Sequence, residues 1–241
     1  MQQKISVSSL LRFLSVFVIC NQLVALITQL IGWKTGHWSM LGLMQLVDMN
    51  AKFSVSLGFK LFELFLVSLV CWVIARHPDQ PSRWRPHWAF LSAMFFCMSF
   101  DEAACTHQLI GRVVTEKFHG HGLFYYGFAF PGAVLALCLF IFMLGFLGSL
   151  PKKIAAGMIL SGFLYVLGAA GVDAVLGAFV ERFDLGQHVY SNWDQFAVRL
   201  MTDIEGLLQM GSMILYLKTL FDYLRFIGGK DAVDCVIRLE F

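Results

Sequence analysis

The sequence predicts an all-α integral membrane protein, a bundle of about six transmembrane helices. Of its 241 residues, 58% are hydrophobic and only 14% are charged, whereas an ordinary soluble domain carries about 25% charged residues. The mean hydropathy of the chain is +0.70. Several apolar stretches also reach about 20 residues, which is the length that an α-helix needs to cross the hydrocarbon core of a bilayer. Together these observations exclude a soluble globular protein.

Six stretches have the length and apolar character of a span: residues 11–31, 53–75, 87–110, 123–147, 154–180 and 199–221. The first follows Lys4 and Arg12 and therefore begins like a signal peptide. Its apolar run continues to about Ile31 without a small-residue cleavage site. We therefore expect an uncleaved first transmembrane helix rather than a cleaved leader.

The connections between these stretches carry turn and interface signals. Residues 33–50 mix Trp33 and Trp38 with polar residues, which favours a short helix in the membrane interface. Prolines in residues 77–86, and Pro151 between the fourth and fifth stretches, cannot continue a helix. Residues 182–198 form another polar connection. We expect one domain over residues 1–228, followed by a short charged tail over 229–241.

The distribution of basic residues predicts the orientation. If the N-terminus is cytoplasmic, most of the 18 lysines and arginines lie on the cytoplasmic side, as the positive-inside rule requires. Both termini are then cytoplasmic. The formal net charge of +2 is too small to indicate nucleic acid, so the expected partner of the basic residues is the lipid bilayer.

The stretch FFCMSFDEAACTHQLIGR, residues 95–112, places Asp101, Glu102 and His107 inside an apolar predicted helix. Ionisable groups at membrane depth cost several kcal/mol unless they are paired or face a cavity, so by default they mark function. With the topology above, polar residues of the other helices fall in the middle or outer half of their spans: Asn21, Gln22, Gln29, Lys60, Glu63, Tyr125, Tyr126, Asp173, Asp203, Glu205 and Gln209. The pattern predicts a polar cavity that opens outward and is closed below by an apolar plug.

The chemistry of this cavity has two readings. In a regular helix, Asp101 and His107 point about 120° apart and Glu102 and His107 about 140° apart. A shared metal would therefore need a helix distortion or ligands from other helices, such as Glu205 and Asp173. Carboxylates and imidazole could then hold Zn, Mn or Fe, with Asp101, Glu102, His107 and Glu205 as the metal ligands. Alternatively, crowded carboxylates could share a proton.

Other polar residues have a structural reading beside the functional one. Thr202, Glu205, Gln209 and further polar residues recur at three- and four-residue steps on one face of the last helix, which suits either a cavity or hydrogen bonds between helices. Lys60 and Glu63 are spaced to pair with each other. Small residues around Asp173 would let a neighbouring helix approach closely.

One further pattern offers candidate ligands for a metal, and the cysteines do not. His119 and His121 in KFHGHG could touch a metal or lie in a solvated loop. The six cysteines form no CxxC pair, and five of them lie in apolar runs, so we interpret them as small buried hydrophobes.

The motif MSFDEAACTHQ resembles the Ser-hydrophobic-Asp-Glu-Ala-Ala-x-x-His-Glu signature of an uncharacterised family of bacterial multi-pass membrane proteins. IEGLLQMGSMILYL and VDMNAKFSVSLGFKLFELFLVSLV resemble further segments of that family, so the likeness covers roughly residues 45–220. The resemblance implies a bacterial inner (plasma) membrane location. It marks Ser99, Asp101, Glu102, His107, Glu205 and Gly211. The sequence departs from the family at Gln108 and Gln209, where the family has Glu, and at Lys52.

Three functions follow as hypotheses. The first is an outward-facing site that binds a cation, a proton or a small polar ligand for transport or sensing, with the residues Asp101, Glu102, His107, Glu205, Asp173, Gln209 and Ser99. The second is a metal-dependent hydrolase or oxidase that acts on lipid at the outer leaflet, with a metal-bound water as nucleophile. The third is a structural subunit of a membrane complex, whose buried polar groups only hold helices together.

Overall fold

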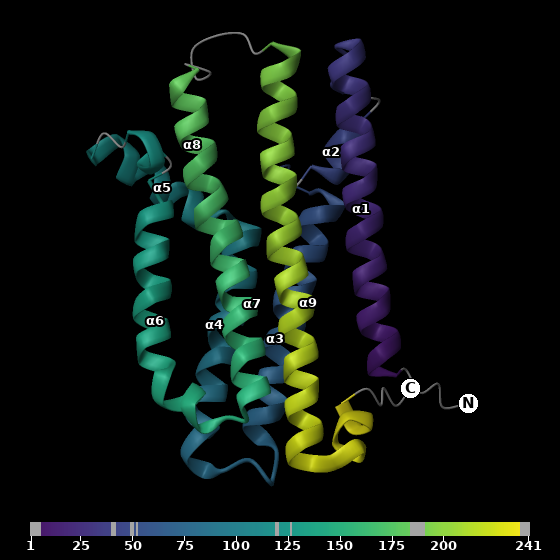
Figure 1. Ribbon diagram of the computed structural model, residues 1–241, viewed down its shortest axis with the longest axis vertical. Helices are drawn as coiled ribbons and strands as arrows, with labels where there is room; N and C mark the ends of the chain where they lie inside the picture. Colours follow the sequence, from purple (N-terminus) through teal and green to yellow (C-terminus); the bar gives the residue numbers. More distant parts are fainter. Residues whose placement is uncertain are drawn as a thin grey trace.

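The computed structural model describes residues 6–39, 42–48, 51, 53–118, 121–125, 127–183 and 191–236, and this part of the chain contains helices and no strand (Figure 1). Of the residues singled out in the sequence, Lys52, His119 and Tyr126 lie outside the described part. The all-α prediction is confirmed.

Nine α-helices and three shorter turns of helix make up the described chain. The α-helices are α1 (Val7–Thr35), α2 (Leu43–Val47), α3 (Val55–Arg76), α4 (Arg85–Ala104), α5 (Thr106–Phe118), α6 (Ala129–Ser149), α7 (Lys152–Val166), α8 (Asp173–Arg182) and α9 (Asn192–Val236). Two 3₁₀ turns cover Ser82–Trp84 and Gly122–Phe124, and a π-helical segment, η4, covers Leu167–Val172.

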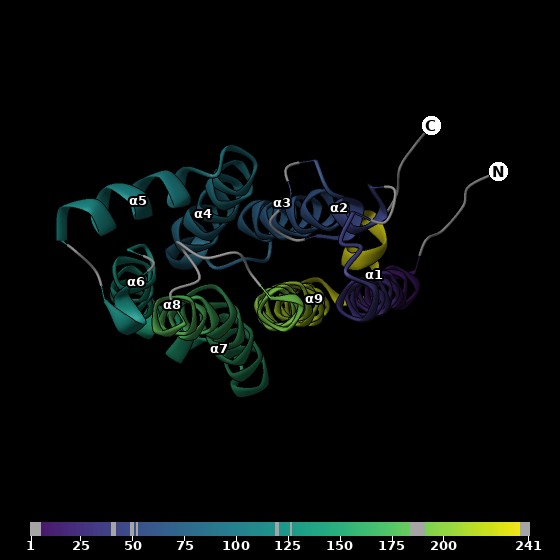
Figure 2. The same cartoon turned by 90° about the horizontal axis from the view of Figure 1, so that it is seen from above.

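The long helices lie side by side and alternate in direction (Figure 1). The start of α1, the α3–α4 connection and the α6–α7 turn lie at one end, and α2, the end of α8 and the start of α9 lie at the other. Viewed from above, α9 lies between α1 and the α7–α8 pair (Figure 2), and it packs against α1, α3 and α7. Which end faces the cytoplasm stays a prediction.

Four helical segments are long and apolar enough to cross a membrane: Val7–Thr35, Val55–Arg76, Phe130–Ser149 and Lys152–Arg182. A fifth is obtained if α4 and α5 together count as one broken span. Helix α9 covers the sixth predicted stretch and is long enough, but it carries polar residues such as Asp203, Glu205 and Gln209 along its length. The structure therefore establishes four to five candidate spans, and six spans remain a prediction.

The third predicted span, residues 87–110, is not one continuous helix. Helix α4 ends at Ala104, and Cys105 adopts a left-handed conformation with φ 54° and ψ 35°. Beyond the break the chain turns by 73° into α5, which extends from α4 along the outer edge of the bundle on the side of α6 (Figure 2). Hydrophobic periodicity does not reveal a left-handed cysteine, because this conformation usually belongs to Gly, Asn or Asp.

The fifth predicted span, residues 154–180, is helical throughout but changes its winding in the middle. The π-helical segment Leu167–Val172 separates α7 from α8. Within it, a Cβ added at Gly168 would lie 3.0 Å from Leu208 Cβ and 3.1 Å from the Glu205 carbonyl oxygen. The prediction that small residues near Asp173 let a neighbouring helix approach closely is thereby confirmed, and that neighbour is α9.

The main buried apolar cluster occupies the half of the bundle near the start of α1. It includes Leu14, Leu64, Trp88, Phe146 and Leu217, from α1, α3, α4, α6 and α9. Past this core, α9 continues beyond the predicted end of its span at residue 221 to Val236, with a kink at Gly229, where φ is 71° and ψ is −168°. Polar side chains gather instead in the other half of the bundle.

Candidate functional site

Lys60 on α3 forms an ion pair with Glu102 on α4. The Lys60 Nζ and Glu102 Oε1 atoms are 2.6 Å apart, and the two side chains are only 9% and 14% exposed. The predicted alternative, a pair between Lys60 and Glu63 on one helix, is not what the structure shows. Glu63 is fully buried, and neither of its carboxylate oxygens has a hydrogen-bond partner in the described part of the chain.

Asp101 and His107 meet across the break at Cys105. The His107 Nδ1 and Asp101 Oδ2 atoms are 2.7 Å apart. The backbone N–H of His107 also donates to Asp101 Oδ1 at 2.9 Å, so this carboxylate satisfies one of the unpaired donors at the start of α5. The prediction that these two side chains point about 120° apart is wrong, because the α-helix does not continue through residue 105.

Asp173 and Glu205 approach the same groups from α8 and α9. Asp173 is within electrostatic range of His107, Lys60 and Glu102, and Glu205 is within range of Asp173, Lys60 and Glu102. Gln209, one turn along α9, donates from Nε2 to Glu205 Oε1 at 2.8 Å.

Two residues change the predicted set of site residues: Ser99 has a contact between helices, and Tyr165 is added. Ser99 donates its hydroxyl to the Leu61 carbonyl oxygen at 3.1 Å and so joins α4 to α3. Tyr165 on α7, which the sequence did not single out, lies within electrostatic range of Asp101, Glu102 and Glu205. In sequence it reads as one more aromatic residue of an apolar helix. We use the name polar cluster for Lys60, Asp101, Glu102, His107, Tyr165, Asp173, Glu205 and Gln209.

The predicted metal ligands do not form a metal-binding group in the described structure. Within the part of the chain that the structure describes, no set of three or more His, Cys, Asp or Glu side chains is arranged to hold a metal ion. His121 in the KFHGHG loop instead contacts Glu181 at the end of α8, with Nδ1 and Oε1 2.7 Å apart. The backbone N–H of Gly122 donates to the other oxygen of Glu181, so this carboxylate fastens the loop to α8.

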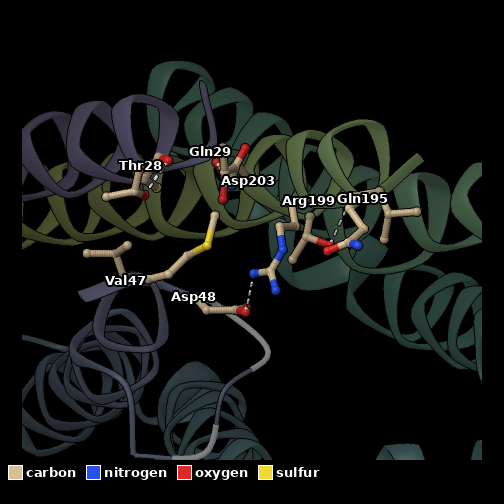
Figure 3. A pocket seen from close by; sticks show the side chains of 11 residues that line it. Thr28, Gln29, Val47, Asp48, Gln195, Arg199 and Asp203 are labelled. Carbon is tan, nitrogen blue, oxygen red and sulfur yellow. Dashed lines mark hydrogen bonds and ion pairs between the residues drawn. The ribbon is translucent and has the colours of Figure 1, made fainter. Parts of the chain in front are cut away.

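A second group of polar residues lines a pocket of about 350 Å³ between α1, α2 and α9 (Figure 3). Gln29 Nε2 donates to Asp203 Oδ2 at 2.7 Å, and Arg199 pairs with Asp48 at 2.8 Å. No spacing in the sequence links Arg199 to Asp48, because they are 151 positions apart.

Helix α9 separates the pocket from the polar cluster. Asp203 and Glu205 are two residues apart, so they point about 200° apart around the helix axis. Asp203 meets Gln29 of α1, whereas Glu205 lies within range of Asp173 on α8. Helices α1 and α8 lie on different sides of α9 (Figure 2). The polar residues that the sequence assigns to a single cavity therefore form two groups, one on each of these sides.

Comparison with known proteins identifies one family. A family model described as a domain of unknown function, DUF8692, matches residues 11–223. No curated protein and no solved structure matches the chain.

Proposed function

Since this chain belongs to DUF8692, a family described only as a domain of unknown function, we propose its function from the polar cluster itself. The protein binds a cation, a proton or a small polar ligand in this cluster, for transport or sensing. We further propose that it does so as a six-span protein of the bacterial inner membrane with both termini cytoplasmic.

The observation that carries this proposal is the convergence of ionisable side chains from separate helices. The Lys60–Glu102 pair joins α3 and α4, and the Asp101–His107 pair joins α4 and α5. Asp173 is within electrostatic range of both pairs, and Glu205 is within range of the Lys60–Glu102 pair and of Asp173. Each such group at membrane depth costs free energy. A buried ion pair also does not generally stabilise a fold more than apolar residues of similar size would. A binding role gives a reason for the cost.

Differences in exposure suggest how a ligand would reach the cluster. The Asp101 and His107 side chains are 37% and 22% exposed, so they are accessible from outside the bundle. Lys60 and Glu102 are more deeply buried. A cation or proton would therefore meet the Asp101–His107 pair first and the inner carboxylates afterwards.

The test uses purified protein in nanodiscs with three salts as probes: NaCl, KCl and MgCl₂, each titrated by calorimetry at fixed ionic strength. Proton uptake or release is measured by repeating each titration in buffers of different ionisation enthalpy. We expect saturable binding or coupled proton exchange that Asp173→Asn and Glu205→Gln abolish. Glu116→Gln is the matched control, because Glu116 is an exposed carboxylate on α5. Wild-type heats and proton exchange in both cluster variants would contradict the proposal.

A structural role is the second candidate, and hydrogen bonds between helices favour it. Ser99 donates to Leu61, and Ser68 donates to the Ser92 carbonyl oxygen, so both contacts fasten α3 to α4. Asp173→Asn and Glu205→Gln separate the two candidates, because neither variant removes a partner of the Lys60–Glu102 pair. A scaffold loses its thermal stability in these variants, whereas a binding site keeps its fold and loses its ligand.

A further inference from the structure

We infer that the pocket between α1, α2 and α9 binds a small organic cation, a protonated amine attached to an apolar body. This site is separate from the polar cluster and does not depend on the function proposed for it. Its residues come from the first two helices and from the last one: Gln29 on α1, Val47 on α2, and Arg199 and Asp203 on α9 (Figure 3).

The size and lining of the pocket set the size of the ligand. The volume of about 350 Å³ is far larger than one bare ion or one water molecule, which occupies about 30 Å³ in the liquid. Ala25, Met44, Val47 and Val198 supply apolar surface on the walls. An occupant with an apolar portion would bury that surface, which is favourable.

The charges in the pocket select a cation. Asp48 and Arg199 form an ion pair at 2.8 Å. Asp203 lies within electrostatic range of both and is only 8% exposed. Its described hydrogen bond is to the uncharged amide of Gln29. When Asp203 is ionised, its charge has no cationic hydrogen-bond partner among the described residues, and a cationic ligand would neutralise it.

The hydrogen-bonding groups select a donor. Gln29 Oε1 is buried without a hydrogen-bond partner in the described chain, and the Gln29 residue is 5% exposed. A buried acceptor without a partner costs about 1–3 kcal/mol. The Thr28 and Thr202 hydroxyls donate to the carbonyl oxygens of Ala25 and Val198, so their oxygens can still accept. An ammonium group carries only donors; it can donate to Asp203, and a rotation of the buried Gln29 amide would let Oε1 accept from it as well.

The test compares benzylammonium, benzyl alcohol and benzoate, which share an apolar ring and differ in the charge of the polar group. Binding to the full chain in nanodiscs is measured by calorimetry at pH 7.5. We expect saturable binding of benzylammonium, at least tenfold weaker binding of benzyl alcohol, and no binding of benzoate. Asp203→Asn should weaken the binding of benzylammonium at least tenfold. Asp222→Asn is the matched control, because it removes an exposed carboxylate of the same helix.

A second variant keeps the test decisive if Asp203→Asn does not fold. Met44→Trp fills the pocket from α2 without changing its charges and should abolish benzylammonium binding. Asp173→Asn, in the polar cluster, should leave that binding unchanged, so failure of one site is distinguishable from failure of the other. The inference is overturned if benzylammonium gives no saturable heat, if benzoate binds as tightly, or if well-folded Asp203→Asn and Met44→Trp bind like the wild type.

Discussion

At the scale of single residues, the Lys60–Glu102 contact shows how costly a buried charge becomes when its partner is lost. Both side chains are largely inaccessible to solvent and 2.6 Å apart. Removing one partner of a buried pair typically costs about 3–5 kcal/mol, because the remaining charge is uncompensated, whereas replacing both by apolar residues can be nearly neutral.

We therefore expect Lys60→Met to lower the free energy of unfolding by about 3–5 kcal/mol, and the double variant Lys60→Met/Glu102→Leu to recover most of that loss. Denaturant unfolding in detergent micelles measures both. Lys218→Met is the control, because Lys218 is exposed and contacts Asp222 on the same helix at 3.5 Å; a pair of this kind contributes about 0–1 kcal/mol. A double variant no more stable than Lys60→Met would refute this account of the pair.

The left-handed backbone conformation of Cys105 brings His107 back to Asp101. A β-branched residue is a strong outlier in this conformation, whereas glycine adopts it freely. We expect Cys105→Val to destabilise the protein by about 1–2 kcal/mol and Cys105→Gly to leave its midpoint of thermal unfolding unchanged or higher. Cys97→Val, at an exposed helical cysteine of α4, is the control. Equal effects of Val and Gly at position 105 would argue against a left-handed residue there.

At the scale of helices, α7 and α9 pack closely where α7 has glycine. A Cβ added at Gly157 would lie 2.5 Å from Thr219 Oγ1 and 2.9 Å from its Cγ2. Distances this short require the neighbouring side chain or a helix to move.

Gly157→Ala should therefore destabilise the protein by about 1–3 kcal/mol, as overpacked sites do, and adding Thr219→Ala should restore most of the loss. The midpoint of thermal unfolding reports both effects. Gly162→Ala lies on the same helix with no atom within 4 Å of the added Cβ, so its higher helix propensity should raise stability by up to about 1 kcal/mol. Equal loss at positions 157 and 162 would mean that α9 does not pack there.

The helices show which part of the fold could be predicted from the sequence. Apolar runs of about 20 residues predict the positions of the long helices, because a helix that crosses a bilayer needs such a run. The break at Cys105 and the π-helical segment before Asp173 were missed, because both are changes of backbone conformation that leave residue composition unchanged. These two features help to bring His107 and Asp173 to the polar cluster, so the sequence named these residues but did not predict the backbone geometry that brings them there.

At the scale of the whole molecule, the alternating helices divide the chain into two ends. Ser82 lies at the end that holds the α3–α4 connection, and Leu123 belongs to the turn that follows α5; both residues are exposed. With both termini in the cytoplasm, Ser82 faces the cytoplasm and Leu123 faces outward.

Single cysteines at these positions, in a chain whose six native cysteines are replaced, test this topology in intact cells. A membrane-impermeant maleimide should label Leu123→Cys and should label Ser82→Cys only after the cells are opened. The opposite labelling would reverse the orientation. It would also place the entrance of the polar cluster on the cytoplasmic side.

The neighbours of α9 are the feature of the whole molecule that could not be predicted from the sequence. Periodicity alone places Asp203 and Glu205 on one helix, but it does not say which neighbours that helix has. Gln29 and Asp203 are 174 positions apart, and nothing in a single sequence pairs them. One predicted cavity therefore became a cluster on one side of α9 and a pocket on the other.

Asp203 and Glu205 belong to the same helix, so the backbone of one does not turn about the helix axis without the backbone of the other. A twist of α9 about its own axis that swings Asp203 further toward α1 carries Glu205 away from Asp173 by the same angle. The spacing of two residues along α9 thus sets the angle between the two sites.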